Sequence, residues 1–272
     1  MTLPLATNAR MYAITPQAAI AWDAIFKWLA ASTGLPLAAL DHPPPASLAG
    51  LWSRPRIGCA VMCGWPFIEA HPRPYLLGTP IPSPPRYRGR PQYWSDLVVR
   101  ADSTYMSIED TFGGTLGWTI ADSQSGFNML RHHLIGLGST PDAPLYARSV
   151  EGLVNPLGAL KAVVDGRVDV APVDSFCHDL LKAGDHPATR ATRTIAATAS
   201  SPMPVLVASP DIGEGEARRL SEALCTSHRD PQMAPHLAAA LVERFVVPDT
   251  ADFEYCRSID RAARGAGHFV PM

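Results

Sequence analysis

The stretch TIADSQSGFNMLRHHLIGLG, residues 119–138, indicates a strand that passes directly into a helix. Apolar side chains recur at helical spacing at Phe127, Leu130 and Leu134, and small polar residues stand just before them at 122–126. The first turn of a helix has backbone N–H groups without partners and lies at the positive end of the helix dipole. Small hydrogen-bonding residues at that point favour the binding of an anion.

The sequence around this stretch alternates between strand and helix patterns. Such alternation is typical of an α/β unit, in which helices cover the faces of a sheet. The predicted elements are a strand at 115–121, a helix at 125–136, a strand near 145–149, a helix at 156–165, a strand at 168–173, a helix at 174–183 and a strand at 191–197.

The N-terminal part of the chain predicts another α/β unit. Pro16 begins a helical pattern that ends at residues 32–34. RIGCAVMCGWPF, residues 56–67, contains the continuous apolar run of a strand buried on both faces. TPIPSPPRYRGRP, residues 79–91, holds so many prolines that we expect extended connecting chain there.

The C-terminal part shows helical patterns near 214–226, 231–241 and 249–264, and these helices need a sheet to cover. We therefore expect the chain to return to the first unit after building the second. Residues 1–94 and 200–272 would form one lobe and residues 95–199 an inserted lobe, with a ligand cleft between the two.

Composition excludes several classes of protein. The chain has 272 residues, of which 47% are hydrophobic and 18% charged, and its formal net charge is −2, which disfavours both disorder and nucleic-acid binding. No spacing of histidines and cysteines predicts a metal site, and no motif predicts a cofactor. No long apolar run predicts a membrane span, and the N-terminus lacks a signal-peptide pattern, which favours a soluble protein that is not exported.

Four motifs carry a resemblance to a known family: YWSDLVVRADS at 93–103, SIEDTFGG at 107–114, DSQSGFNML at 122–130 and DGRVDVAPVDS at 165–175. In order and spacing they resemble the substrate-binding proteins of phosphate and phosphonate ABC transporters. MY at 11–12 and CGWPF at 63–67 fit the same family more loosely.

The resemblance implies an α/β fold of the type II periplasmic-binding kind, with two lobes that close on a small anionic or zwitterionic ligand. It also implies a non-catalytic protein in the periplasm with an ABC-transporter permease as partner. The absence of a signal-peptide pattern leaves a cytoplasmic location open. We expect a monomer that binds no nucleic acid.

The resemblance also implies which residues hold the anion. The family's Ser-Thr-Ser-Gly-like segment corresponds to Ser123, Gln124, Ser125 and Gly126, where Gly126 would let the ligand approach the backbone closely. Gln124 replaces the family's threonine, which would change the size or preference of the pocket. The competing interpretation is that Ser123 or Ser125 only caps the helix.

Three aromatic residues are further candidates for ligand contact. Tyr93 matches the family's tyrosine at the segment that crosses between the lobes, Trp65 lies just past a strand end, where open α/β sheets bind ligands, and Tyr12 lies in the loosely matching MY pair. Each of them could instead be an ordinary core residue.

Asp174 and Asn155 complete the candidate site. Asp174 matches an acidic or polar position that faces the ligand's amino group, although an aspartate there would also cap the helix that follows. Where phosphonate binders carry a histidine contact, this chain has Asn155 or Pro156, so one anion contact would be weakened or lost.

Some enzymes share the two-lobe fold, among them menaquinone-pathway dehydratases and thiamin-pyrimidine synthases, and a ligand sensor is a further alternative. An enzyme would need an acid or base near the reacting atom. Its candidate groups here are Asp122, Asp174, Cys63 and His178, and no spacing in the sequence brings them together. We therefore expect no catalytic residues.

Overall fold

The computed structural model describes residues 3–272, and the chain divides into two compact units. Unit 1 comprises residues 1–92 and 202–252, and unit 2 comprises residues 93–201 and 253–272. The chain therefore passes from one unit to the other at 92–93, 201–202 and 252–253.

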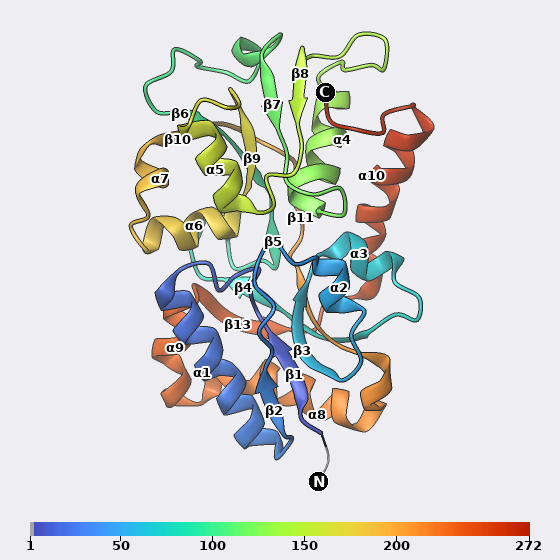
Figure 1. The fold of residues 1–272 in the computed structure, drawn as a ribbon. Coiled ribbons are helices and arrows are strands. Elements are labelled where there is room, and N and C mark those ends of the chain that lie inside the picture. Colours follow the sequence, from blue (N-terminus) through green and yellow to red (C-terminus); the bar gives the residue numbers. More distant parts are fainter. Residues whose placement is uncertain (1–2) are drawn as a thin grey trace. The chain divides into compact units, whose positions relative to one another are not determined.

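Unit 1 is built on a six-stranded sheet with the order β13-β4-β12-β3-β1-β2 (Figure 1). The strand β1 pairs in parallel with β2 and β3, whereas β12 runs antiparallel to β3 and β4, and β13 runs antiparallel to β4. The strands span Leu5–Asn8 (β1), Leu37–Ala39 (β2), Ile57–Met62 (β3), Tyr75–Pro82 (β4), Val205–Ala208 (β12) and Val242–Val246 (β13).

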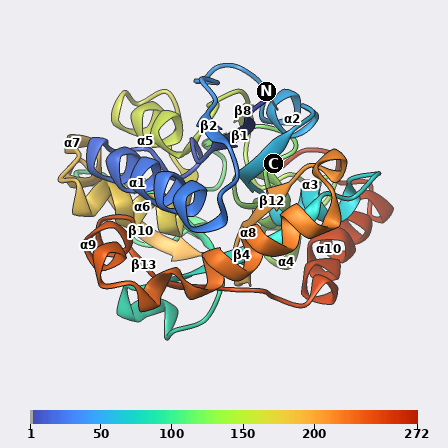
Figure 2. The ribbon, with the colours of Figure 1, turned by 90° about the horizontal axis from the view of Figure 1, so that it is seen from below.

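Helices α1 (Pro16–Thr33), α8 (Glu214–Thr226) and α9 (Ala234–Ala239) pack on one another and on this sheet, as Figure 2 shows. The first of them begins and ends as predicted. Thr15 Oγ1 accepts a hydrogen bond from the N–H of Ala18, Pro16 occupies the first turn, and Gly34 ends the helix with a φ of 67°. Two short helices, α2 (Leu48–Trp52) and α3 (Gly64–Glu69), flank β3 in the sequence.

Unit 2 has a three-stranded antiparallel sheet of order β10-β6-β9, and β7 and β8 form a parallel pair that meets it through the bridge between Leu116 and Val170. Its strands are β6 (Ser95–Arg100), β7 (Thr115–Gly117), β8 (Arg148–Val150), β9 (Ala171–Asp174) and β10 (Thr192–Ala197). Its helices are α4 (Met129–Gly136), α5 (Pro156–Val164), α6 (Ser175–Ala183), α7 (Pro187–Arg190) and α10 (Glu254–Gly265).

Short pieces complete the two units. The strands β5 (Gln92–Tyr93) and β11 (Ser201–Pro202) pair with each other where the chain crosses between units. The 3-10 turns are η1 (Pro85–Tyr87), η2 (Glu109–Thr111), η4 (Pro210–Ile212), η5 (Ser227–Arg229), η6 (Pro231–Met233) and η7 (Thr250–Phe253). None of the described helices combines the length and the apolar character needed to cross a membrane.

The C-terminal helix corrects one prediction. Residues 200–272 were expected to return as a whole to the first lobe, but residues 253–272 belong to unit 2. In α10 the buried residues Cys256, Ile259 and Ala263 form one stripe at helical spacing. That stripe packs in unit 2, where α10 contacts α4 and the buried Arg131 pairs with Asp260.

The proline-rich segment at 79–91 corrects a second prediction. Residues 79–91 were expected to lack regular structure, but residues 79–82 belong to β4, and Pro80 and Pro82 stand opposite Phe245 and Val242 of β13. The register shifts between Val242 and Arg244, as at a β-bulge, which tolerates prolines in a paired strand.

Candidate functional site

The anion-binding stretch predicted from the sequence begins with a wide helical turn. Gln124–Asn128 (η3) is π-helical, with the N–H of Asn128 donating to the carbonyl of Ser123 at 3.0 Å, and α4 continues the helix directly. Ser123 Oγ accepts a hydrogen bond from the N–H of Gly126 at 2.9 Å. Ser123 therefore caps this helix, while its contact with a ligand stays a prediction.

The next two residues leave hydrogen-bond donors unused. Among the described residues, nothing accepts a hydrogen bond from the backbone N–H groups of Gln124 and Ser125. The Ser125 hydroxyl also has no partner there, while the Ser125 carbonyl accepts from Ser95 Oγ at 2.7 Å. Two amides and one hydroxyl thus lie together at the positive end of a helical segment, the arrangement that binds anionic oxygens.

The side chain of Gln124 is used within the protein. It is fully buried, its Nε2 donates to Ser201 Oγ at 3.1 Å, and its Oε1 accepts from Asn128 Nδ2 at 2.9 Å. Asn128 Nδ2 also donates to the carbonyl of Cys256 at 2.9 Å, which joins the helix start to α10. The backbone N–H is therefore the donor group of Gln124 that has no acceptor among the described residues.

Gly126 is required by the packing of a neighbouring segment. A Cβ atom at this position would lie 1.9 Å from Thr119 Oγ1 and 3.0 Å from Thr119 Cβ. The glycine therefore lets the helix start lie against residue 119, a reason that the sequence alone did not suggest.

Asp174 lies at the end of β9, next to this helix start. Its Cα is paired with that of Ser95 across the strands β6 and β9, and Ser95 is the residue whose hydroxyl holds the Ser125 carbonyl. Ser95 therefore brings Ser125 and Asp174 to the same edge of the sheet.

The Asp174 carboxyl caps α6 and is buried. Its Oδ1 accepts hydrogen bonds from the N–H groups of Phe176 and Cys177, both at 2.9 Å, so the capping alternative describes one of its two oxygens. Oδ2 has no hydrogen bond among the described residues. Burial raises the pKa of Asp174 to about 7, the two N–H groups oppose the rise and Asp96 adds to it.

Asn155 also acts as a cap, for α5, where its Oδ1 accepts from the N–H of Gly158 at 2.9 Å and Pro156 occupies the first turn. The loop before it lies beside the segment that contacts Gly126, because the N–H of Gly152 donates to the carbonyl of Thr119 at 3.1 Å. Asn155 thus follows a loop fixed near the helix start.

The three aromatic candidates divide between the units. Tyr93 is fully buried in β5 of unit 2. In unit 1, Tyr12 is fully buried and Trp65 is 8% exposed. They follow the carboxyl ends of β1 and β3, which are parallel neighbours, so both stand at the edge where open sheets bind ligands.

Sequence reasoning missed Ser95 and also Asp96, the buried partner of His178, which it had named only as a candidate group for an enzyme. His178 Nδ1 lies 2.8 Å from Asp96 Oδ2, and Trp94 Nε1 donates to Asp96 Oδ1 at 3.0 Å. The signal for Ser95 and Asp96 was a serine and an aspartate at the start of a strand, directly before the apolar residues 97–99. No group of three or more metal-ligating side chains occurs within residues 3–272.

Comparison with known proteins agrees with this architecture. The family model of the periplasmic substrate-binding proteins of phosphonate ABC transporters matches residues 13–253. Among curated proteins, none matches the sequence.

Several solved structures are similar. A binding protein component of an ABC phosphonate transporter from Pseudomonas aeruginosa has a TM-score of 0.81 and 18% identity, covering 98% of this chain and 88% of its own. PhnD1 from Prochlorococcus marinus, solved with methylphosphonate, has a TM-score of 0.76 and 12% identity, covering 96% and 98%. A Xanthomonas citri protein bound to ATP has a TM-score of 0.67 and 16% identity, covering 97% and 99%.

At these identities the solved structures show the fold, which is the two-unit α/β fold of type II periplasmic binding proteins. The family model goes further, since it spans most of the sequence. The chain therefore belongs to the periplasmic substrate-binding proteins of phosphonate ABC transporters and is a solute-binding protein.

Proposed function

We propose that the start of η3 in unit 2 holds the oxygens of a phosphonate or a related small anion. The supporting observation is the pair of unused amides of Gln124 and Ser125 together with the Ser125 hydroxyl. Hydrogen bonds to a charged group contribute about 1.5–3 kcal/mol each, so a few such bonds account for useful affinity. The methylphosphonate complex of PhnD1 and the ATP complex of the Xanthomonas citri protein supply tetrahedral phosphorus oxyanions as the natural class to test.

We propose in addition that Asp174 contacts a positively charged group of the ligand through Oδ2. Ser95 places this carboxyl beside the anion-binding turn, so one small zwitterion reaches both. The pKa of about 7 leaves the carboxyl partly protonated near neutral pH, and an ammonium group would favour its ionised form. An aminoalkylphosphonate then binds more tightly than an alkylphosphonate of equal length.

The remaining candidates complete the proposal. Asn155, Tyr93, Tyr12 and Trp65 are ligand contacts in addition to their roles in the fold. We propose that the protein is a periplasmic monomer that binds its ligand without converting it chemically. It then delivers the ligand to an ABC-transporter permease. The family's name supports the compartment and the partner.

Isothermal titration calorimetry tests the anion site directly. We expect methylphosphonate to bind the full chain, and Ser125→Ala to weaken binding about tenfold or more, because a hydrogen bond to a charged oxygen is lost. The unfolding midpoint should barely change, since the Ser125 hydroxyl has no partner within residues 3–272. Ser258→Ala, on the exposed side of α10, is the matched control and should keep wild-type affinity.

Unchanged affinity of Ser125→Ala would contradict the proposed site. Binding of acetate or chloride as tight as that of methylphosphonate would contradict the proposed ligand class.

A further inference from the structure

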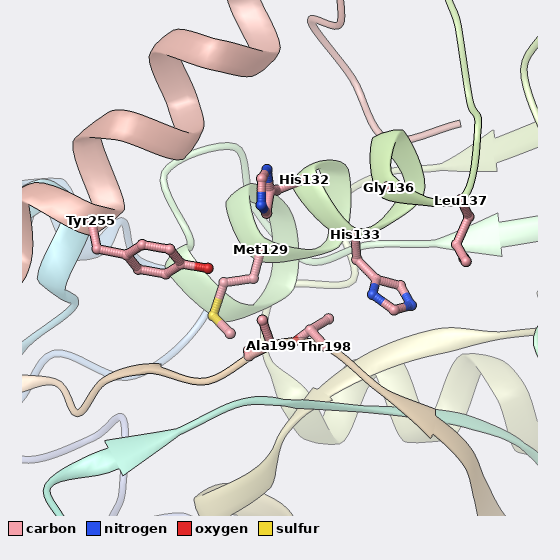
Figure 3. A pocket seen from close by; sticks show the side chains of 8 residues that line it. All are labelled: Met129, His132, His133, Gly136, Leu137, Thr198, Ala199 and Tyr255. Atoms are coloured by element: carbon pink, nitrogen blue, oxygen red, sulfur yellow. Dashed lines mark hydrogen bonds between the residues drawn. The ribbon is translucent and has the colours of Figure 1, made fainter.

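A cavity lies in unit 2, and none of the residues of the proposed phosphonate site borders it. It has a volume of about 290 Å³ and is bordered by α4, by Tyr255 of α10 and by residues 198–199 (Figure 3). Small-molecule pockets start at roughly this size, and a benzene ring already fits in a cavity of about 150 Å³. The cavity is therefore large enough for one ring with a substituent.

One face of α4 forms its longest wall. Met129, His132, His133, Gly136 and Leu137 all border the cavity, and their spacing of three and four residues places them on a single side of the helix. The other side of α4 packs in the core of unit 2 through Leu130 and Leu134. The cavity side thus differs in chemistry from the packed side, since it carries two imidazoles and a glycine where core contacts would need large apolar groups.

Three polar groups of the wall lack partners. His133 Nε2 is buried and makes no hydrogen bond, and neither the His132 ring nor the Tyr255 hydroxyl has one among the described residues. A buried polar atom that has given up water without gaining a partner is unfavourable, and a ligand group in the cavity would relieve that cost. In Figure 3 the Tyr255 ring extends from α10 toward Met129.

The charge of the wall decides the class of ligand. None of the residues that border the cavity is Lys, Arg, Asp or Glu, so a charged guest would be left without a counter-ion. Gly136 and Leu137 lie at the C-terminal end of α4, where the helix dipole is negative and disfavours anions. Burial, together with the neighbouring His132, lowers the pKa of His133, which disfavours the charged form of its ring.

The walls favour an aromatic guest. A thioether sulfur, a phenol ring and two imidazoles surround the space, and all of these groups make favourable contacts with aromatic rings. We infer that this cavity is a second binding site, separate from the phosphonate site, for a small neutral aromatic molecule that carries one hydroxyl or amide group. The ring packs against Met129, and the polar group exchanges a hydrogen bond with the Tyr255 hydroxyl or with His133 Nε2, which lie on either side of Met129 in Figure 3.

Phenol and benzamide are the probes, with benzoate as the charged analogue of benzamide. We expect calorimetry on the full chain to give a dissociation constant of about 1 mM or tighter for phenol, within the affinity that so few atoms can reach. Phenol should also shift the ring-proton NMR signals of His132 and His133 in a saturable way. Benzoate should bind at least about tenfold more weakly than benzamide because its charge has no partner.

Two glycines provide a matched pair of variants. Gly136 borders the cavity and Gly265 does not; both are helical, and a Cβ at either would meet nothing within 4 Å. Gly136→Phe should block phenol binding, whereas Gly265→Phe should leave it unchanged. Tyr255→Phe should weaken phenol binding about three- to tenfold through the loss of one hydrogen bond.

Methylphosphonate affinity should be the same in Gly136→Phe as in the wild type, so this inference and the proposed function fail separately. The inference is overturned if phenol and benzamide show no saturable binding. It is also overturned if Gly136→Phe and Gly265→Phe reduce the affinity for phenol equally, or if benzoate binds as tightly as benzamide.

Discussion

The Nε2 of Gln124 donates a hydrogen bond to Ser201 Oγ at 3.1 Å, deep inside unit 2. This contact joins the first residue of the proposed anion-binding turn to the segment by which the chain leaves the unit. Together with the bond from Asn128 to Gln124 Oε1, it fixes the position of the turn. The turn is thereby held in place by contacts within unit 2.

We expect Gln124→Ala to lower the free energy of unfolding by about 1–3 kcal/mol, because it leaves buried polar groups without a partner. Urea unfolding followed by circular dichroism measures the change. Gln232→Ala, at an exposed position in η6, should change the same quantity by less than about 0.5 kcal/mol. Equal effects of the two substitutions would show that the Gln124 contacts do not stabilise the unit.

Gly126→Ala should destabilise the protein by about 1–3 kcal/mol, because the added Cβ would lie 1.9 Å from Thr119 Oγ1. Adding Thr119→Ala removes that oxygen and should restore part of the loss, which a double-mutant cycle measures as a coupling free energy. Gly215→Ala in α8 meets nothing within 4 Å and should be neutral or stabilising. Independent, additive effects of the changes at 126 and 119 would argue against this contact.

The stability of the protein should depend on pH through Asp174. Its pKa is about 7 when folded and about 3.9 in an unfolded chain, so the folded state binds more protons between these values. Asp174 therefore lowers stability progressively as the pH rises from about 4 to about 7, and the full penalty is present above that range. Asp174→Asn keeps an oxygen for the cap and should flatten this part of the profile.

Thermal unfolding of wild type and Asp174→Asn across that range provides the measurement. The variant should be the more stable protein at neutral pH, and the two curves should converge toward acid. Asp142→Asn, on the exposed surface, is the control and should follow the wild type. Parallel curves for wild type and Asp174→Asn would mean that the carboxyl does not titrate in this range.

Closure on the ligand, which the family resemblance predicts, can be measured in solution. We expect the radius of gyration from small-angle X-ray scattering to decrease when methylphosphonate is added at saturation. In Ser125→Ala the same decrease should need about tenfold more ligand, in proportion to the lost affinity. A constant radius at a ligand concentration that calorimetry shows to be saturating would exclude closure.

The sequence predicted those parts of the fold that local chemistry determines. The helix α1 begins at Pro16 and ends before Gly34 as its own residues dictate, and the apolar run of β3 is buried along its whole length. The strand β13 was missed because VERFV is short and carries two charged residues. It forms because β4, far away in the sequence, offers a free edge for pairing.

In the candidate site, too, local features could be predicted from the sequence and long-range contacts could not. The cap at Ser123 and the unused amides after it follow from a polar run before a helical pattern, which is visible in the sequence. The hydrogen bond from Ser95 to Ser125 joins residues 30 positions apart, and the neighbour of Gly126 is a side chain of another segment. Contacts of this kind depend on the tertiary fold, so no local pattern could reveal them.

Ser95 stands opposite Asp174 in the sheet while its hydroxyl holds the Ser125 carbonyl. Under the proposed function, the backbone position of Ser95 thus sets the distance between the group that binds the ligand's phosphonate and the group that binds its ammonium. The protein would then select its ligand by length. Among aminoalkylphosphonates, one length of carbon linker would allow both contacts, and shorter or longer homologues would make only one of them.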